Sequence, residues 1–456
     1  MYRATLQKSG LELTAKRVDC DSEFLASQDP WFRPVQLANA PDGNLYIVDM
    51  YREIIEGAAF IPPRMLEELE PSNGTKLGRI YRIVLDSPKS TGSHPEENTS
   101  PETIRMWPSK PKDWVPMLGH PNGWHRDTAA RLLYERKAVE VVEEIRSFAL
   151  QSENALGRIH ALYALRGLGQ LDQDTLHRSL SDSDGSVRMH AIRLSELVAP
   201  FSSEIRESLC LLAHDNDPDV RFQLAFSLGV FTGTARDRAL VALVKRDGEN
   251  PWVRTAVQSA LRQGSGEIFF ELVSDTNYRK SHSAASFLVS LALQASIQNQ
   301  RKDLLFVIKG LQSLSEEEQD LMKKILQGSG LDLGKFFSTE KADDFRQLVS
   351  RWIEDAIQIA QDSNQSSDDR VNAIQTLQFA NFDASKIQSL FTGLLQIRQP
   401  VSVQMAAIAT LDRIDSDTVF DVLLKSWMGL SPYLRSRAME SLLSRQSWIV
   451  RTLDAY

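Results

Sequence analysis

The sequence predicts a mostly α chain, an α-solenoid of stacked helical hairpins that follows a small β-sheet segment. Residues 1–85 contain short β-prone runs between turn signals, which predicts strands. Residues 86–104, rich in Pro, Ser, Thr and Glu without periodic apolar positions, are typical of a linker. In residues 105–456 apolar residues recur at i, i+3, i+4 and i+7, as between Ala138 and Ile145, which predicts helices.

Three strands and a separate hairpin are expected in the first segment. The runs Pro34-Val-Gln-Leu-Ala38 and Asn44-Leu-Tyr-Ile-Val-Asp49 flank the turn Ala40-Pro-Asp-Gly43, in which Pro presets φ and Gly accepts a positive φ. Arg79-Ile-Tyr-Arg-Ile-Val84 alternates apolar and polar residues, which indicates a half-buried strand. The other hairpin is expected to turn at Lys8-Ser-Gly-Leu-Glu12.

A capping residue followed four positions later by Arg recurs through the helical segment. The pairs are Asn122/Arg126, Asn154/Arg158, Asp184/Arg188, Asp217/Arg221, Asn250/Arg254, Ser366/Arg370 and Ser431/Arg435. Successive arginines lie 32, 30, 33, 33, 116 and 65 residues apart. The last interval divides into 34 and 31 if Gln404 replaces an Arg, and the interval of 116 leaves room for about three degenerate units. This period predicts a repeat architecture.

The recurring pair has a physical basis. Asn, Asp or Ser at an N-cap accepts hydrogen bonds from free N–H groups of the first helical turn, and a Pro directly after it loses no donor that the helix needs. Small alanines, which allow close helix approach, follow five of the arginines by three positions: Ala129, Ala161, Ala191, Ala373 and Ala438. One hairpin buries too little surface alone, so neighbouring hairpins must stack.

Residues 262–345 are expected to form the irregular part of the array, because they contain no clean cap-and-Arg pair. Within them, the glycine-containing runs 327–330 and 331–334 are expected to be loops.

Composition and motifs exclude several classes of protein and site. The formal charge of −8 argues against nucleic acid as the main partner, and no apolar run approaches the roughly 18 residues that span a bilayer. Cys20 and Cys210 alone cannot form a disulfide framework, a zinc knuckle or a CxxCH haem attachment. The eight histidines include no i, i+4 metal-binding pair, and no GxxxxGK[ST], GxSxG or HExxH motif occurs. Neither a metal site nor a catalytic residue is therefore predicted.

The two segments resemble two different families. The unit with Asp217-Pro-Asp-Val-Arg221 resembles the HEAT repeat over residues 105–450, which implies an architecture but little about activity. Pro41-Asp-Gly-Asn-Leu-Tyr-Ile-Val-Asp-Met-Tyr-Arg52 and Gly78-Arg-Ile-Tyr-Arg-Ile-Val84 resemble the last part of a β-propeller. That propeller belongs to bacterial "putative membrane-bound dehydrogenase" proteins, which are similar to glucose/sorbosone dehydrogenases. In that exported family a propeller, HEAT repeats and a c-type cytochrome domain follow one another, which implies sugar oxidation or electron transfer with pyrroloquinoline quinone and haem c.

The sequence departs from that family in three ways. It begins late in the propeller, lacks a signal peptide and ends without a CxxCH motif. A blade needs four strands and a closed ring at least four blades, whereas residues 1–85 supply one blade and part of another. We therefore expect a truncated or split relative that holds no cofactor by itself. As written it is expected to be cytoplasmic, or periplasmic or exported if its true N-terminus lies upstream.

Arg33, Asp42, Asp49 and Arg52 are the candidate cofactor-binding residues. They belong to the propeller-like motifs and lie at strand ends, where a quinone carboxylate could meet a guanidinium group. In the alternative interpretation Asp42 shapes its turn, and Asp49 and Arg52 form a structural pair. Charged turn residues are common without function, which favours this alternative.

The arginines of the repeated pairs also have two interpretations. They could form a basic stripe that binds phosphate, or a structural ladder in which each Arg reaches an acidic or amide group at a turn, as the HEAT resemblance implies. The constant offset from the cap favours the ladder. Its expected members are Arg126, Arg158, Arg188, Arg221, Arg254, Arg370 and Arg435.

Two hypotheses for function follow. In the first, the chain is a non-catalytic HEAT-repeat scaffold that binds a partner protein through its helical surface. In the second, it is a fragment or subunit of a quinone-dependent sugar or aldehyde dehydrogenase, completed by a separately encoded propeller and a haem domain. The chain alone is expected not to be an enzyme, although the resemblance implies an oxidoreductase.

Overall fold

The computed structural model describes residues 1–55, 57–66, 73–84, 108–331, 333, 343–380, 382–414 and 416–455. The chain is mostly α, with two small sheets near its N-terminus, which confirms the predicted fold class. It divides into two compact units, Met1–Leu243 and Val244–Tyr456. The predicted linker, residues 86–104, lies outside the described residues, and the domain boundary at residue 85 stays a prediction.

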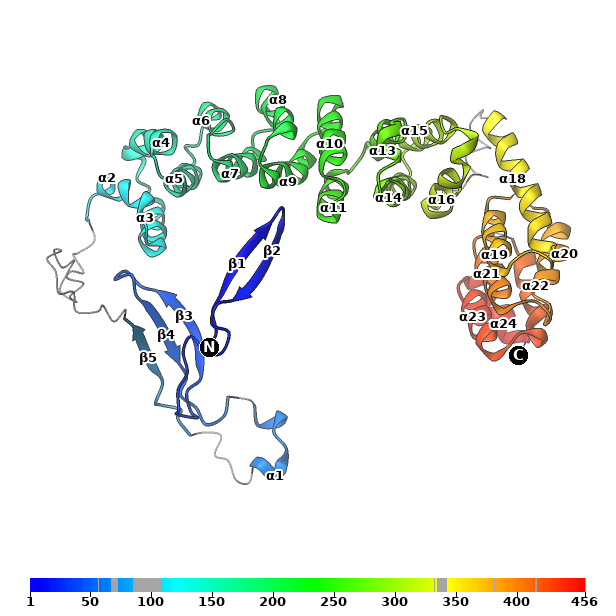
Figure 1. Ribbon diagram of the computed structural model, residues 1–456, viewed down its shortest axis with the longest axis horizontal. Coiled ribbons are helices and arrows are strands. Elements are labelled where there is room, and N and C mark those ends of the chain that lie inside the picture. The colour runs from blue at the N-terminus through cyan, green and yellow to red at the C-terminus, as the bar shows by residue number, and fades with distance from the viewer. Residues whose placement is uncertain are drawn as a thin grey trace. The chain divides into compact units, whose positions relative to one another are not determined.

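The two sheets form where the strand patterns predicted them (Figure 1). The first is a hairpin of β1 (Ala4–Ser9) and β2 (Glu12–Arg17), and its two-residue turn contains Gly10 at φ +59°. The second is antiparallel with strand order β3 (Pro34–Asn39), β4 (Leu45–Asp49) and β5 (Arg79–Ile83). Gly43, at φ +79°, closes the turn between β3 and β4, because glycine adopts this conformation without steric cost.

Only the central strand of the second sheet is well buried. Ile47 is fully buried in β4, opposite Leu37 of β3 and Tyr81 of β5. All residues of β3 are exposed, and the outer edges of β3 and β5 pair with no other strand among the described residues. Within the described part of the chain, both strands therefore have an edge that no strand covers.

The helices of the first unit alternate between two rows. Helices α3, α5, α7 and α9 contact one another in succession, and α4, α6 and α8 form the second row. The helices are α1 (Pro63–Leu66), α2 (Pro111–Trp114), α3 (Gly123–Glu135), α4 (Val142–Gln151), α5 (Ala155–Gly167), α6 (Gln173–Ser179), α7 (Gly185–Ser195), α8 (Ser203–Leu211), α9 (Pro218–Ser227) and α10 (Thr234–Asp247), which continues into the second unit.

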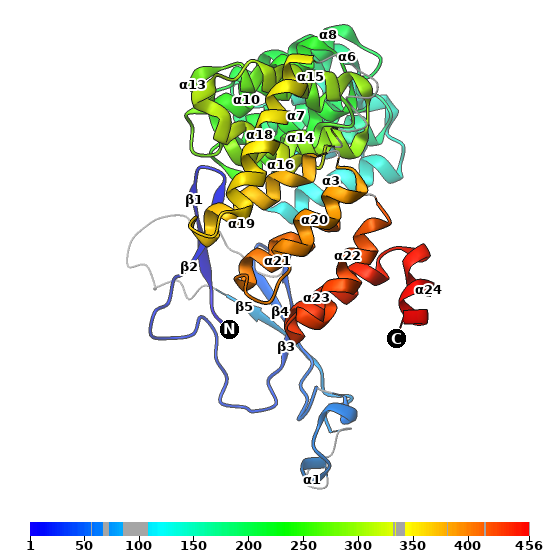
Figure 2. The same cartoon turned by 90° about the vertical axis from the view of Figure 1, so that its right-hand side faces the viewer.

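The second unit contains two similar rows in its C-terminal part. Helices α19, α21 and α23 lie side by side, as do α18, α20 and α22 (Figures 1 and 2). The helices are α11 (Pro251–Ala260), α12 (Ser265–Val273), α13 (Thr276–Arg279), α14 (Ala284–Gln298), α15 (Arg301–Gln312), α16 (Gln319–Ser329), α18 (Asp343–Gln361), α19 (Ser367–Thr376), α20 (Ala384–Leu394), α21 (Val401–Leu411), α22 (Thr418–Ser426), α23 (Pro432–Leu443) and α24 (Gln446–Ala455).

Short 3-10 helices join or extend several of these elements. They are Ala58–Phe60, Pro116–Gly119, Val139–Val141, Leu212–His214, Leu228–Val230, Glu316–Glu318, Leu377–Phe379 and Trp427–Gly429.

Capping and small side chains explain where the stacked helices begin and how they pack. All seven predicted capping residues are N-caps whose side chains accept from backbone N–H groups. The five alanines that follow the arginines are buried. Because the small side chains lie in the core, adjacent helices pack closely, as the spacing predicted.

The predicted loop at residues 327–330 is wrong for its first three residues, which belong to α16. A Cβ on Gly328 would lie 2.3 Å from a methyl carbon of Val289 in α14, so this glycine permits close helix packing. Gly330, at φ +64°, ends the helix as a left-handed C-cap. Of the second predicted loop, residues 332 and 334 lie outside the described residues.

Candidate functional site

Asp42 supports the turn between β3 and β4. Its carboxylate accepts hydrogen bonds from the backbone N–H of Asn44 at 3.0 Å and the hydroxyl of Tyr46 at 3.1 Å. The guanidinium Nε of Arg82 in β5 lies 3.1 Å from the same carboxylate. Burial alone would raise the pKa of Asp42, but the hydrogen bonds and the Arg82 charge hold it below the usual value. Asp42 therefore joins the turn to the neighbouring strand.

Asp49 and Arg33 fix the chain on either side of β3 and β4. Oδ1 of the buried Asp49 carboxylate accepts from the N–H groups of Arg33 at 2.7 Å and Tyr51 at 2.9 Å. Tyr51 has a positive φ of 49°, so its hydrogen bond holds an uncommon conformation. The Arg33 guanidinium donates to the carbonyl oxygens of Pro30, Phe32 and Glu53.

Arg52 enters this arrangement through its backbone, whose N–H donates to the carbonyl of Trp31 at 3.1 Å. The carboxylate of Asp49 bonds to the N–H groups of Arg33 and Tyr51 and not to the Arg52 side chain. The charged groups of Arg33, Asp42 and Asp49 thus bond to neighbouring loops and, for Asp42, to β5. The assignment of these four residues to a quinone site stays a prediction.

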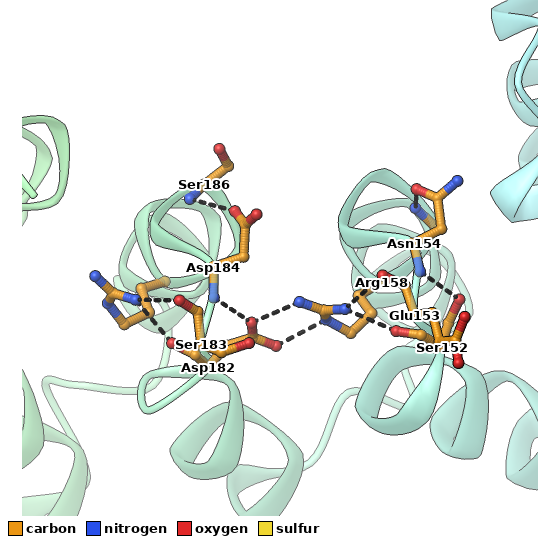
Figure 3. A network of polar contacts seen from close by, with 10 residues as sticks. Ser152, Glu153, Asn154, Arg158, Asp182, Ser183, Asp184 and Ser186 are labelled. Atoms are coloured by element: carbon orange, nitrogen blue, oxygen red, sulfur yellow. Dashed lines mark hydrogen bonds and ion pairs between the residues drawn. The ribbon is translucent and has the colours of Figure 1, made fainter.

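The repeated arginines join successive helical pairs, as Figure 3 shows for one junction. Arg158 of α5 donates from Nε and Nη2 to both oxygens of Asp182, at 2.8 and 2.7 Å. Its Nη1 donates to the carbonyls of Ser152 and Glu153, in the turn that precedes α5. One arginine therefore binds both the turn before its own helix and the turn of the following helical pair.

Arg188 of α7 repeats this arrangement in the next helical pair. It donates to both oxygens of Asp215 at 2.7 Å and, through Nη1, to the carbonyls of Asp182 and Ser183. Oδ1 of Asp215 also accepts from the N–H of Asp217, the N-cap of α9. Burial would raise the pKa of Asp215, but the bonds from Arg188 and Asp217 hold it below the usual value.

The other predicted arginines also donate to carbonyls that precede their own helix, and the second partner is an imidazole for Arg126 and an uncharged amide for Arg370. Arg126 donates to the carbonyl of His120 and to Nε2 of His160, and Arg370 to the carbonyl of Ala360 and the amide oxygen of Gln399. Arg221, Arg254 and Arg435 donate to carbonyls of the turns before α9, α11 and α23. Gln404 does the same before α21, at the carbonyls of Leu395 and Gln396.

The expectation that residues 262–345 contain no cap-and-Arg pair is wrong. Asp275 is the N-cap of α13, and Arg279 follows it by four positions. Arg279 donates to the carbonyl of Val273, six residues earlier, and pairs with Glu318 at 2.6 Å. The same sequence offset would have identified this pair, which was obscured because α13 has only four residues.

A joint between the second sheet and the first helices was not predicted. Nδ2 of Asn122 donates to the carbonyl of Ala40 at 2.8 Å, and Nε2 of His125 lies 2.9 Å from the carbonyl of Pro41. The residues joined are 82 and 84 positions apart, so no local pattern indicates the contact. The hairpin makes a further contact, an ion pair between Lys8 and Asp219 of α9.

Two imidazole rings pack together at this joint. The ring centroids of His120 and His125 are 4.3 Å apart, and Nδ1 of His120 accepts from the N–H of Asn122 at 3.0 Å. Burial, followed by the nearby His125 and Arg126, lowers the pKa of His120. Burial and Arg126 likewise lower the pKa of His160. The neutral forms of His120 and His160 are therefore favoured.

The second unit contains a cavity of about 480 Å³ among α16, α18 and α19. Trp352 and Ala356 contribute apolar surface, and Nζ of Lys323 lies 5.6 Å from the Trp352 ring. Asp355 and Asp369 line it as well, so it combines apolar surface with charges of both signs.

Neither a metal centre nor a membrane span is found among the described residues. His, Cys, Asp and Glu form no group of three or more there that could hold a metal ion. Within the same part of the chain, no helix combines the length and apolar character needed to cross a bilayer.

The family described as "Domain of unknown function (DUF7133)" matches residues 1–87. The match covers both sheets and ends before α2, so it includes the four charged candidates but none of the repeated arginines. No curated protein matches the chain.

Proposed function

We propose that this chain is a non-catalytic HEAT-repeat scaffold that mediates protein–protein interaction. The observation that carries the proposal is the bidentate junction of Arg158 with Asp182, repeated by Arg188 with Asp215. Each junction fixes one helical pair against the next through buried, charge-assisted hydrogen bonds. Stacked pairs of this kind provide an extended binding surface.

The junctions matter for binding because they limit movement within the array. Each guanidinium binds two carbonyls of its own turn and both oxygens of a carboxylate in the next turn. A surface that is already ordered loses less conformational entropy when it binds a partner. The structural function of the arginines and the scaffold function of the chain are therefore parts of one proposal.

Affinity capture with a quantitative readout tests the scaffold. The tagged full chain is immobilised in extract of its own cells, and bound proteins are quantified relative to the bait at low and high salt. A scaffold should retain at least one protein in a fixed molar ratio, and the purified partner should then bind the chain in calorimetry. Failure to retain any protein at every salt concentration would contradict the proposal.

The second candidate is a subunit of a quinone-dependent sugar or aldehyde dehydrogenase. One observation favours it: among the described residues no strand pairs with the outer edges of β3 and β5, so the sheet can accept further strands. A separately encoded propeller would supply those strands, the cofactor and most of its ligands. Mixing this chain and that protein with pyrroloquinoline quinone and aldoses should reduce an electron-accepting dye. A flat trace with a correctly assembled complex would exclude this function.

A further inference from the structure

Two neighbouring turns in the second unit expose large apolar side chains. Ile397 lies between α20 and α21, and Met428 lies between α22 and α23; each is 82% exposed. Val401 and Tyr433, in the first turns of α21 and α23, are also exposed. We refer to Ile397, Val401, Met428 and Tyr433 as the turn ridge.

Side-chain hydrogen bonds to backbone carbonyls fix the conformation of both turns that carry the turn ridge. The buried Gln404 donates to the carbonyls of Leu395 and Gln396, directly before Ile397. Arg435 donates to the carbonyls of Trp427 and Met428. The ladder positions therefore fix the turns that present the exposed apolar side chains.

The two turns lie at the same edge of the array. Helix α20 packs on α22, and α21 packs on α23, so the turns within these pairs are neighbours (Figure 2). Packed helices are separated by about 8–10 Å, and seven residues of a helix span about 10 Å. Apolar residues one heptad apart on a partner helix could therefore contact both turns.

The turns that carry the ridge contain basic residues and no acidic ones. Residues 395–402 and 424–435 include Arg398, Lys425 and Arg435 but no Asp or Glu. Two equivalent turns of the first unit are acidic instead: residues 181–186 contain two aspartates and residues 214–219 contain three. The ridge thus combines apolar anchors with local cations on a chain whose formal charge is −8.

We propose that the turn ridge binds an acidic amphipathic helix of a partner protein. Its apolar face would cover Ile397 and Met428, and its carboxylates would lie beside Arg398 and Lys425, both of which are exposed. This proposal rests on the scaffold function and assigns it a site and a kind of partner.

A pair of synthetic peptides tests the chemistry directly. Both form amphipathic helices with Leu at i, i+3, i+4 and i+7; one carries Glu at all other positions and the other carries Lys. Fluorescence anisotropy measures their binding to the full chain. Because the chain is negative overall, non-specific attraction favours the Lys peptide, whereas the turn ridge favours the Glu peptide. Equal binding, or preference for the Lys peptide, would overturn the proposal.

Substitutions then locate the binding site. The double variant Ile397→Glu, Met428→Glu should bind the Glu peptide about tenfold more weakly or worse, because both anchors are lost and like charges are introduced. Phe201→Glu is the matched control, since Phe201 is 89% exposed in the other unit. Circular dichroism checks that each variant is folded. Unchanged affinity of the folded double variant would refute the assignment.

Two further measurements separate the possible outcomes. If vesicles containing anionic phosphatidylserine bind the chain and the double variant abolishes this binding, the ridge recognises membrane and the proposal is wrong. If the double variant still retains every partner found by affinity capture, the scaffold function stands and the turn ridge is not its site. Loss of one partner with the double variant, but not with Phe201→Glu, is the expected result.

Discussion

Removal of the Asp182 carboxylate tests whether the repeated arginines stabilise the array. In Asp182→Ala, the Arg158 guanidinium loses two hydrogen bonds of 2.8 and 2.7 Å. It keeps its bonds to the carbonyls of Ser152 and Glu153. The substitution also removes the acceptor for the N–H of Asp184, the N-cap of α7. The loss of stability should therefore affect α5, α7 and the turn that precedes α7.

The burial of this pair sets the expected magnitude. The side chains of Arg158 and Asp182 are 10% and 12% exposed. Breaking a buried pair costs about 3–5 kcal/mol, whereas an exposed pair contributes about 0–1 kcal/mol. Because Arg158 keeps two carbonyl partners, we expect a loss of about 2–3 kcal/mol. Asp182→Asn keeps an acceptor for Asp184 and should cost about half as much.

Amide hydrogen exchange is the appropriate assay, because a chain with two compact units need not unfold in one transition. A loss of 2–3 kcal/mol in local stability should accelerate exchange in α5 and α7 about 30- to 150-fold. Glu135→Ala is the control, since Glu135 and Arg131 are 54% and 63% exposed and 3.8 Å apart. Acceleration by Asp182→Ala no greater than in this control would refute the structural function of the ladder.

Two further predictions concern packing and pH. Gly266→Ala would place a Cβ 2.1 Å from the carbonyl oxygen of Asp303, so it should destabilise the second unit by about 3 kcal/mol or more in thermal unfolding. A Cβ on Gly393 in α20 meets nothing within 4 Å. Gly393→Ala should therefore be neutral or stabilise the unit by up to about 1 kcal/mol in the same assay. Burial, with nearby cations, lowers the folded pKa values of His120, His160 and His190, so the unfolded state binds more protons. The stability from these histidines is complete above their ordinary pKa of about 6.5 and is lost as pH falls from there through their lowered folded pKa values. Exchange protection of α3, α5 and α7 should fall between pH 7.5 and 5.5, while α19–α23, which contain no histidine, serve as the internal control.

Local sequence signals predicted the elements but only part of the contacts between them. Helix starts were identified because an N-cap and its N–H partners lie within three residues of each other, as at Asp184. The Arg158–Asp182 partner was not specified by spacing, since 24 residues and two helix boundaries separate the pair. Gly328 was predicted in a loop because glycine indicates a turn, and only the position of Val289 explains its place inside a helix.

The choice of Asn or Asp at a cap explains why the joint between sheet and helices was missed. Either residue can cap a helix with a side-chain oxygen, so the two look equivalent in sequence. Only Asn has a spare donor: Nδ2 of Asn122 reaches the carbonyl of Ala40, and Nδ2 of Asn154 reaches that of Gly119. The amide at these two caps therefore joins segments that are 82 and 35 residues apart.

Asn122→Asp tests this distinction between capping and joining. The new carboxylate can still accept from the N–H of Trp124, so α3 should keep its protection. The same group would face the carbonyl oxygen of Ala40, where a 2.8 Å hydrogen bond becomes a repulsion between two acceptors. We expect amides of residues 34–49 to exchange at least several-fold faster, while Asp184→Asn, at a cap without this long-range contact, leaves them unchanged. If residues 34–49 keep their protection in Asn122→Asp, the amide of Asn122 does not join the sheet to the array, and the contact of His125 with Pro41 must hold it instead.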